Sequence, residues 1–114
     1  MSASPVEVVE NYLTALQAKD LTKLPLAENI IFTDPLAGTL TSKAAVVAFL
    51  SHILPILQTV TIHQHLLDHH RVVTRWDAQT TLGVINILEW FEITEDKIQV
   101  AQAFFDPRAM TQTT

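Results

Sequence analysis

The hydrophobic period of the sequence changes near residue 60, and this change narrows the choice of fold sharply. Residues 5–19 and 42–53 carry apolar side chains at three- and four-residue steps, which predicts two amphipathic helices. From Val60 onward the period is two, and the runs are rich in β-branched and aromatic residues. Helices followed by a meander of strands predict an α+β domain, with the helices on one face of a curved, mainly antiparallel sheet.

Capping and turn residues predict where these elements begin and end. Ser4 is the expected N-cap of the first helix, and Thr41 or Ser42 that of the second. A further short helical turn over residues 21–26 brings the expected number of helices to about three. Gly83 is expected to bend the longest strand. The expected strands cover residues 28–34, 60–68, 71–76, 80–93 and 97–105, with a loop after the first and a turn at 94–96.

Length and composition predict one domain over residues 1–114. The 114 residues are 48% hydrophobic, enough to bury a continuous core. The chain has no cysteine, which is compatible with a reducing compartment, and we expect a cytoplasmic location. No segment resembles a signal peptide, and the apolar runs are far shorter than the ~20 residues that cross a bilayer.

The charge balance argues against polyanionic partners. Seven basic and twelve acidic residues give a net charge of -5, and the basic residues are scattered. Such a chain repels phosphate backbones and anionic lipid. Neither nucleic acid nor a membrane is an expected partner.

Tyr12 and Asp34 are polar residues in apolar surroundings, and each has two interpretations. Tyr12 lies at the border of the apolar stripe of the first helix, so its hydroxyl either donates into a pocket or marks an ordinary core edge. Asp34 ends the first strand, directly before Pro35. Its carboxylate either turns toward a pocket mouth or bonds the amides of the following loop.

Glu89 is the third such residue. It shares a strand face with Ile85, Ile87 and Phe91, while Leu88 lies on the other face, and both faces are expected to be buried there. A buried carboxyl is either paired or protonated, and a neutral carboxyl can donate a hydrogen bond to a developing oxyanion. The alternative is an ion pair across the sheet with one of two arginines, Arg75 or Arg71.

Two other groupings suggest different chemistry. The alternation places His63 and His65 on one strand face, where Asp68, His69 or His70 would complete a metal site, although a polar surface patch explains them as well, and we expect no metal. Water activation for epoxide opening would use Asp34, Arg75 and Asp77, although the last two also make a plain surface ion pair.

Several segments resemble the first half of a ketosteroid isomerase, within the SnoaL-like and ketosteroid isomerase-like branch of the NTF2-like superfamily. They are residues 8–16, 19–21, 32–35 and 43–46. In that family a helix tyrosine and a protonated strand aspartate form an oxyanion hole, and an aspartate at the end of the first strand moves the proton. These positions correspond to Tyr12, Glu89 and Asp34, with glutamate replacing the strand aspartate. Residues 54–80 match no isomerase pattern.

The resemblance implies a cone-shaped (cystatin-like) fold around a pocket for a small, largely apolar molecule, and a homodimer formed through the outer sheet face. It implies an isomerase that needs no cofactor and moves a proton next to a carbonyl. The alternatives are a non-catalytic ligand-binding or protein-interaction module, and an epoxide hydrolase-like enzyme. The ligand's identity is left open. Residues expected to line the pocket or core are Phe32, Phe49, Ile85, Ile87, Phe91 and Phe104.

Overall fold

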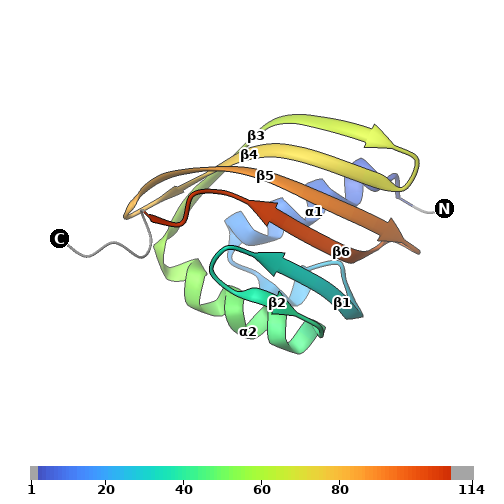
Figure 1. The fold of residues 1–114 in the computed structure, drawn as a ribbon, viewed down its shortest axis with the longest axis horizontal. Helices are drawn as coiled ribbons and strands as arrows, with labels where there is room; N and C mark the ends of the chain where they lie inside the picture. The colour runs from blue at the N-terminus through green and yellow to red at the C-terminus, as the bar shows by residue number, and fades with distance from the viewer. Residues whose placement is uncertain (1–2, 109–114) are drawn as a thin grey trace.

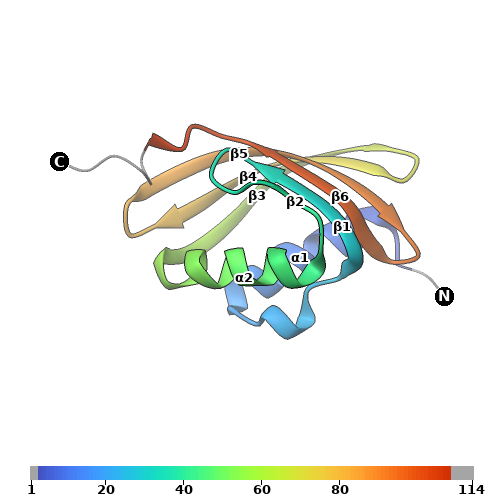
Figure 2. The ribbon, with the colours of Figure 1, turned by 60° about the horizontal axis from the view of Figure 1, so that its bottom comes forward.

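A computed structural model describes residues 3–108 and consists of two α-helices packed on a curved six-stranded sheet (Figure 1). Both helices cover the concave face, as the turned view makes plain (Figure 2). The predicted α+β class is therefore confirmed. The elements are α1 (Pro5–Ala18), η1 (Leu21–Lys23), β1 (Leu26–Asp34), β2 (Gly38–Leu40), α2 (Lys43–Ile53), η2 (Leu54–Ile56), β3 (Leu57–Asp68), β4 (Arg71–Thr80), β5 (Gly83–Thr94) and β6 (Lys97–Phe104), where η marks a single 3-10 turn.

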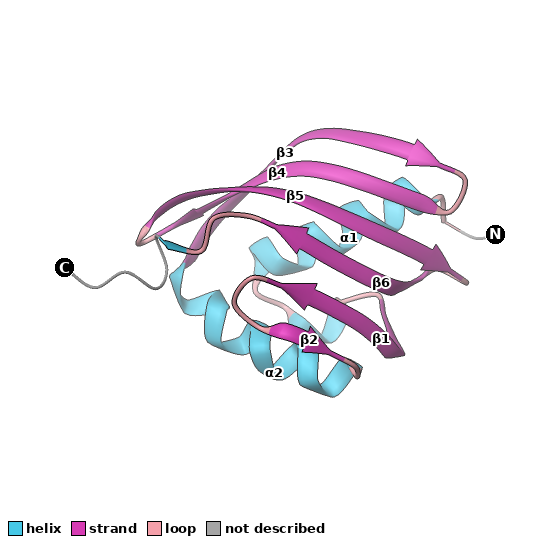
Figure 3. Ribbon diagram, viewed as in Figure 1, coloured by secondary structure: helices cyan, strands magenta, loops and turns pink. Residues whose placement is uncertain are grey.

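The sheet runs in the order β2-β1-β6-β5-β4-β3, so the strand nearest the N-terminus lies beside the last one (Figure 3). The pair β1–β6 is parallel, and the other neighbouring pairs are antiparallel. The strands from β3 to β6 form the meander that the period-two pattern predicted.

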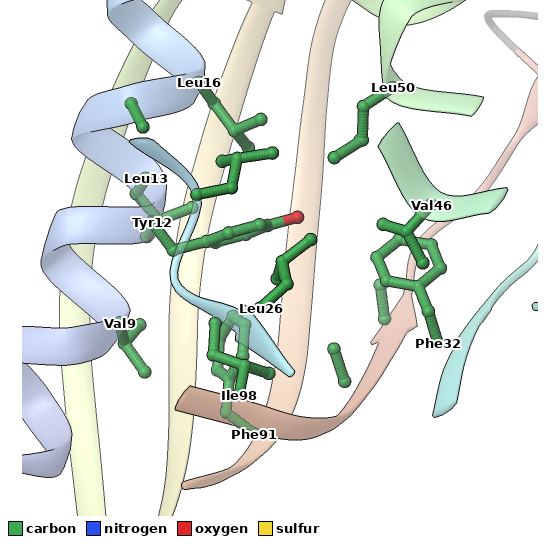
Figure 4. Packing of buried hydrophobic residues seen from close by; sticks show 14 of the residues in the cluster. Val9, Tyr12, Leu13, Leu16, Leu26, Phe32, Val46, Leu50, Phe91 and Ile98 are labelled. Atoms are coloured by element: carbon green, nitrogen blue, oxygen red, sulfur yellow. The ribbon is translucent and has the colours of Figure 1, made fainter. Parts of the chain in front are cut away.

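Helix α1 begins at the predicted cap. The Ser4 hydroxyl accepts a hydrogen bond from the Glu7 amide, and the Glu7 carboxylate accepts one from the Ser4 amide, both at 3.1 Å. This reciprocal pair satisfies backbone donors that the first turn leaves without partners. Val9, Leu13 and Leu16 face the core, where Figure 4 shows them beside the sheet residues.

Helix α2 begins at Ser42, whose hydroxyl accepts from the Ala45 amide at 3.1 Å. The expected third helix is wrong in extent: only the 3-10 turn η1 forms, and Pro25 lies two residues after its end. Neither described helix is long and apolar enough to span a membrane.

The region around Gly83 differs from the prediction. Strand β4 continues to Thr80, and Gly83 opens β5 after a tight turn instead of bending one long strand. Its φ of 126° suits glycine, which carries no Cβ. The Thr80 hydroxyl closes the turn by accepting from the Leu82 amide and donating to the Gly83 carbonyl. The loop expected after β1 also contains a short strand, β2.

A bulge in β6 changes which residues face the core. Glu92 pairs with Val100 but Ile93 pairs with Ile98, so Gln99 is the extra residue. Beyond it the alternation is reversed. The prediction for Phe104 is therefore wrong: its side chain lies on the outer face, 54% exposed.

The outer sheet face is open to solvent next to Glu89. Leu88 is 47% exposed and Trp90 39%. The expectation that both faces are buried at this point is therefore wrong, because the described helices cover the concave face alone.

Candidate functional site

A cavity lies between the two helices and the concave sheet face. Its volume is about 80 Å³, and it opens to solvent at its mouth. The lining is apolar apart from a few polar groups, and it consists of Tyr12, Leu16, Phe32, Asp34, Leu36, Phe49, Leu50, Ile53, Leu54, Leu57, Trp76, Ala78, Thr80, Ile85, Ile87, Glu89, Ala103 and Phe105.

The structure brings the three predicted polar residues to this cavity from three elements: Tyr12 from α1, Asp34 from β1 and Glu89 from β5. Four of the apolar residues expected there also line it, namely Phe32, Phe49, Ile85 and Ile87. The other two do not. Phe91 is fully buried behind Tyr12, and Phe105 takes the place expected for Phe104.

Tyr12 extends from α1 with its hydroxyl directed away from the helix, toward the space below Leu50 (Figure 4). Its ring packs edge-on against Phe91, with ring centroids 5.8 Å apart. The hydroxyl makes no hydrogen bond within residues 3–108. Burial raises the pKa of Tyr12, and the negative charges of Glu89 and Asp34 raise it further. Tyr12 is therefore a neutral hydrogen-bond donor at pH 7.

Glu89 is a buried carboxyl with one fixed oxygen. It is 2% exposed, and burial raises its pKa to about 8; the Trp76 hydrogen bond acts to lower the pKa and the Asp34 charge to raise it. The carboxyl is therefore mainly neutral at pH 7. The Trp76 indole N–H donates to Glu89 Oε1 at 3.1 Å. Because an indole N–H can only donate, Oε1 accepts, and this contact favours the proton on Oε2, since a carbonyl oxygen is the better acceptor.

Asp34 serves the loop and the cavity together. Its Oδ1 accepts hydrogen bonds from the Leu36 amide at 2.8 Å and the Ala37 amide at 2.6 Å, which is the predicted turn-forming role. Its Oδ2 makes no hydrogen bond within the described chain. Burial raises the pKa of Asp34, while the two amides act to lower it. The turn interpretation and the cavity interpretation thus hold for different oxygens of one carboxyl.

The arrangement can stabilise negative charge on a ligand oxygen and exchange a proton with it. Tyr12 and neutral Glu89 offer two donors in surroundings of low polarity, where such bonds are strong. Asp34 offers an acceptor. Between residues 3 and 108 no cluster of three or more His, Cys, Asp or Glu side chains is placed to hold a metal ion.

The metal alternative fails on geometry. A bulge at His63, between the pairs Ile62–Trp76 and Gln64–Arg75, interrupts the alternation in β3. His63 contacts Asp77 on the outer face at 2.8 Å, whereas His65 lies on the concave side and contacts Glu10 of α1 at 3.0 Å. The expectation that the two histidines share a face is therefore wrong.

The epoxide-opening alternative also lacks its geometry. Asp77 lies on the outer face, bound to His63 and to Asn86, and Arg75 is exposed on the same face. Asp34 lines the cavity on the opposite side of the sheet. The proposed ion pair of Glu89 with an arginine is likewise absent, because its partner among the described residues is Trp76.

Trp76 lines the cavity and contacts Glu89, but it is not among the site residues predicted from the sequence. Thr74 pairs with Glu89 across β4 and β5. Trp76, two residues after Thr74, is therefore the diagonal neighbour of Glu89 on the same sheet face. Recognising the hairpin turn at residues 81–82 would have set this register. The prediction of one continuous strand through that turn concealed the pair.

Comparison of the fold finds NTF2-like proteins. An NTF2-like protein from Cytophaga hutchinsonii has a TM-score of 0.82 at 16% identity, covering 98% of each chain. An "LEH-like epoxide hydrolase" from M. tuberculosis has a TM-score of 0.76 at 18% identity, covering 95% of this chain and 86% of that one. A protein with a ketosteroid isomerase-like fold from Catenulispora acidiphila, in complex with trimethylamine, has 0.77 at 14%, covering 94% and 90%.

These likenesses establish the fold and confirm the NTF2-like assignment made from the sequence. No curated protein matches the sequence. A family model described as "Domain of unknown function (DUF4904)" matches residues 2–114, which is nearly the whole chain. The chain therefore belongs to the DUF4904 family, with an NTF2-like fold.

Proposed function

We propose that the chain is a cofactor-independent isomerase that moves a proton next to the carbonyl group of a small, largely apolar molecule. The observation that carries the proposal is the meeting of Tyr12, Asp34 and Glu89 in one apolar cavity, each with a polar atom that no described residue binds. A few polar groups that converge in an otherwise apolar cavity, each with an atom free to bond a guest molecule, are typical of a ligand site.

The chemistry assigns one role to each residue. Asp34 Oδ2 removes a proton from the carbon beside the carbonyl, and the electron pair of that C–H bond moves into the enolate. The enolate oxygen accepts hydrogen bonds from the Tyr12 hydroxyl and from protonated Glu89 Oε2. Asp34 then returns the proton to another carbon of the conjugated system, which yields the isomer with no net oxidation.

Residue 89 is a glutamate where the resemblance to ketosteroid isomerases implies an aspartate, and a contact in the structure restrains this longer side chain. A glutamate carries one more rotatable bond, which would spread the positions of its donor oxygen. The Trp76 indole holds Oε1 and so limits this freedom. Trp76 is thus proposed as the positioning residue for the oxyanion donor.

A non-catalytic ligand-binding module is the second candidate. The observation that favours it is the pair of backbone amides on Asp34 Oδ1, because this contact gives Asp34 a structural reason to be present. In that case Tyr12 and Glu89 orient a bound molecule and Asp34 shapes the loop.

The Asp34→Asn variant separates the two candidates. Asparagine keeps an oxygen for the Leu36 and Ala37 amides but cannot take up the proton. We expect the rate at which β,γ-unsaturated ketones are converted to their conjugated isomers to fall by about 10²- to 10⁴-fold. Ultraviolet absorbance of the conjugated product measures this rate. Binding of p-cresol, an enolate mimic, and the unfolding temperature should change little.

Turnover by Asp34→Asn at the wild-type rate would overturn the isomerase proposal. If the wild type converts none of a panel of such ketones, yet p-cresol binds and Tyr12→Phe weakens it sharply, the binding module is the correct function. Asp34→Ala is the matched control for the loop, since it alone removes the oxygen that the two amides contact.

We further propose that the chain acts in the cytoplasm as a homodimer formed through the outer sheet face. Leu88, Trp90 and Phe104 are exposed there, and Leu88 pairs directly with Phe104 across β5 and β6. We call these three residues the outer apolar patch. Contiguous exposed apolar side chains of this kind favour an interface.

A further inference from the structure

The charges around the cavity all have one sign. Its titratable lining residues are Tyr12 from α1, Asp34 from β1 and Glu89 from β5. The lining parts of α2, β3, β4 and β6 contribute no titratable side chain, and no lysine, arginine or histidine appears in the described lining. Above pH 8, where Glu89 ionises as well as Asp34, an anionic ligand would face two carboxylates with no cation to offset them.

The lining is also rich in aromatic rings, which attract cations. Tyr12, Phe32, Phe49, Trp76 and Phe105 all contribute to it. Phe32 and Phe49 lie tilted to each other, with ring centroids 6.0 Å apart. The face of an aromatic ring is negative, and a cation over it gains about 2 kcal/mol or more where water is excluded.

From this combination we propose that the cavity binds an apolar ammonium ion, tertiary or quaternary, with the Glu89 and Asp34 carboxylates as counter-charges and the aromatic lining as its surroundings. Alkyl groups on the nitrogen match the apolar walls. A bare calcium ion does not fit, because it takes about six to eight oxygen ligands. The described lining offers the side-chain oxygens of four residues, Tyr12, Asp34, Thr80 and Glu89.

Binding of such a cation is linked to a proton. The pKa of Glu89 is about 8, so the carboxyl is mainly neutral at pH 7 and must ionise to act as a counter-charge. The cation therefore displaces that proton. Below pH 8 its affinity rises up to about tenfold per pH unit, and it levels off above that. An enolate mimic has the opposite preference, since it needs the proton on Glu89 to remain.

Titration calorimetry with benzyltrimethylammonium tests the proposal, because this ion keeps its charge at every pH. Its neutral control is neopentylbenzene, which has the same shape. At pH 7, in two buffers of different ionisation enthalpy, we expect release of close to one proton per cation bound. We also expect affinity at least tenfold above that of neopentylbenzene, and displacement of p-cresol.

Glu89→Gln is the matched variant, since its amide still accepts from Trp76 and still donates toward the cavity. It should weaken binding of the cation at least tenfold, and an unchanged far-ultraviolet circular dichroism spectrum would show that the variant is folded. Equal affinity for neopentylbenzene, absence of proton release, failure to displace p-cresol, or an unchanged cation affinity in Glu89→Gln would each overturn the proposal. None of these readouts requires turnover, so the isomerase proposal stands or fails separately.

Discussion

At the scale of single residues, Glu89 makes folding depend on pH in an unusual direction. Its pKa is about 8 in the folded chain and 4.5 in an unfolded one. Between those values the folded state binds a proton that the unfolded state lacks, so stability falls as pH rises. Most folded proteins gain stability over the acidic part of this range, because their carboxylates are stabilised in the charged form.

We therefore expect the wild type to lose stability relative to Glu89→Gln between about pH 5 and 8, by up to about 1.4 kcal/mol per pH unit. Above pH 8 the difference should level off. Urea unfolding of both chains across this range checks it, and the variant cancels contributions from other groups. A constant difference between the two chains would show that Glu89 is charged in the folded protein.

Trp76 provides a second test at this scale. Its indole hydrogen bond holds the Glu89 pKa below the value that burial alone would give. We expect Trp76→Phe to raise the pKa of Glu89, seen as a higher pH midpoint of the carboxyl stretching band in infrared spectra. Trp90→Phe is the control, because Trp90 donates to Glu92 on the outer face. A midpoint that falls, or an equal shift in both variants, would contradict the assignment.

The candidate site could be predicted from the sequence as far as residue types and strand ends reveal it. Tyr12, Asp34 and Glu89 stand out because polar groups are costly in apolar segments. The Trp76 contact could not be found in this way, because it depends on the register between two strands. Likewise, no residue pattern indicated a bulge at Gln99. That bulge places Phe105 in the cavity lining and turns Phe104 to the outer face.

At the scale of elements, local chemistry predicted helix starts better than sheet details. Ser4 and Ser42 cap helices where they were expected to, since capping depends on a few neighbouring residues. Gly83 was misassigned because a glycine within a β-rich run suits a bend and a turn equally. The pairing of β1 with β6 joins segments far apart in sequence, which no local pattern reports.

The cap of α2 gives a prediction for this scale. Ser42→Ala removes the acceptor for the Ala45 amide and should lower the free energy of unfolding by about 1 kcal/mol. Ser51→Ala, in the same helix, loses a bond to the nearby Ala48 carbonyl and should change stability by less than about 0.5 kcal/mol. Chemical denaturation measures both, and equal losses would contradict the capping role.

At the scale of the whole molecule, the outer apolar patch gives the test of dimerisation. Leu88→Glu places a charge at its centre, and we expect sedimentation velocity to show a shift from dimer to monomer. Leu67→Glu is the control. Leu67 is 58% exposed, but its cross-strand partner is the fully buried Val72, so it lies on the opposite face. A monomeric wild type, or equal behaviour of the two variants, would contradict the proposed dimer.

The parallel pairing of β1 with β6 also sets an order of events during synthesis. The ribosome releases β1 early, and the short β2 is then its one available sheet neighbour. Strands β3, β4 and β5 can pair hairpin by hairpin as they emerge, but β1 waits for the last strand. Asp34 ends β1, so the proposed proton carrier joins its site only after residues 97–104 have been synthesised. A polypeptide cut short before residue 97 would keep Tyr12, Asp34 and Glu89. It would still lack β6, the strand that joins β1 with Asp34 to β5 with Glu89.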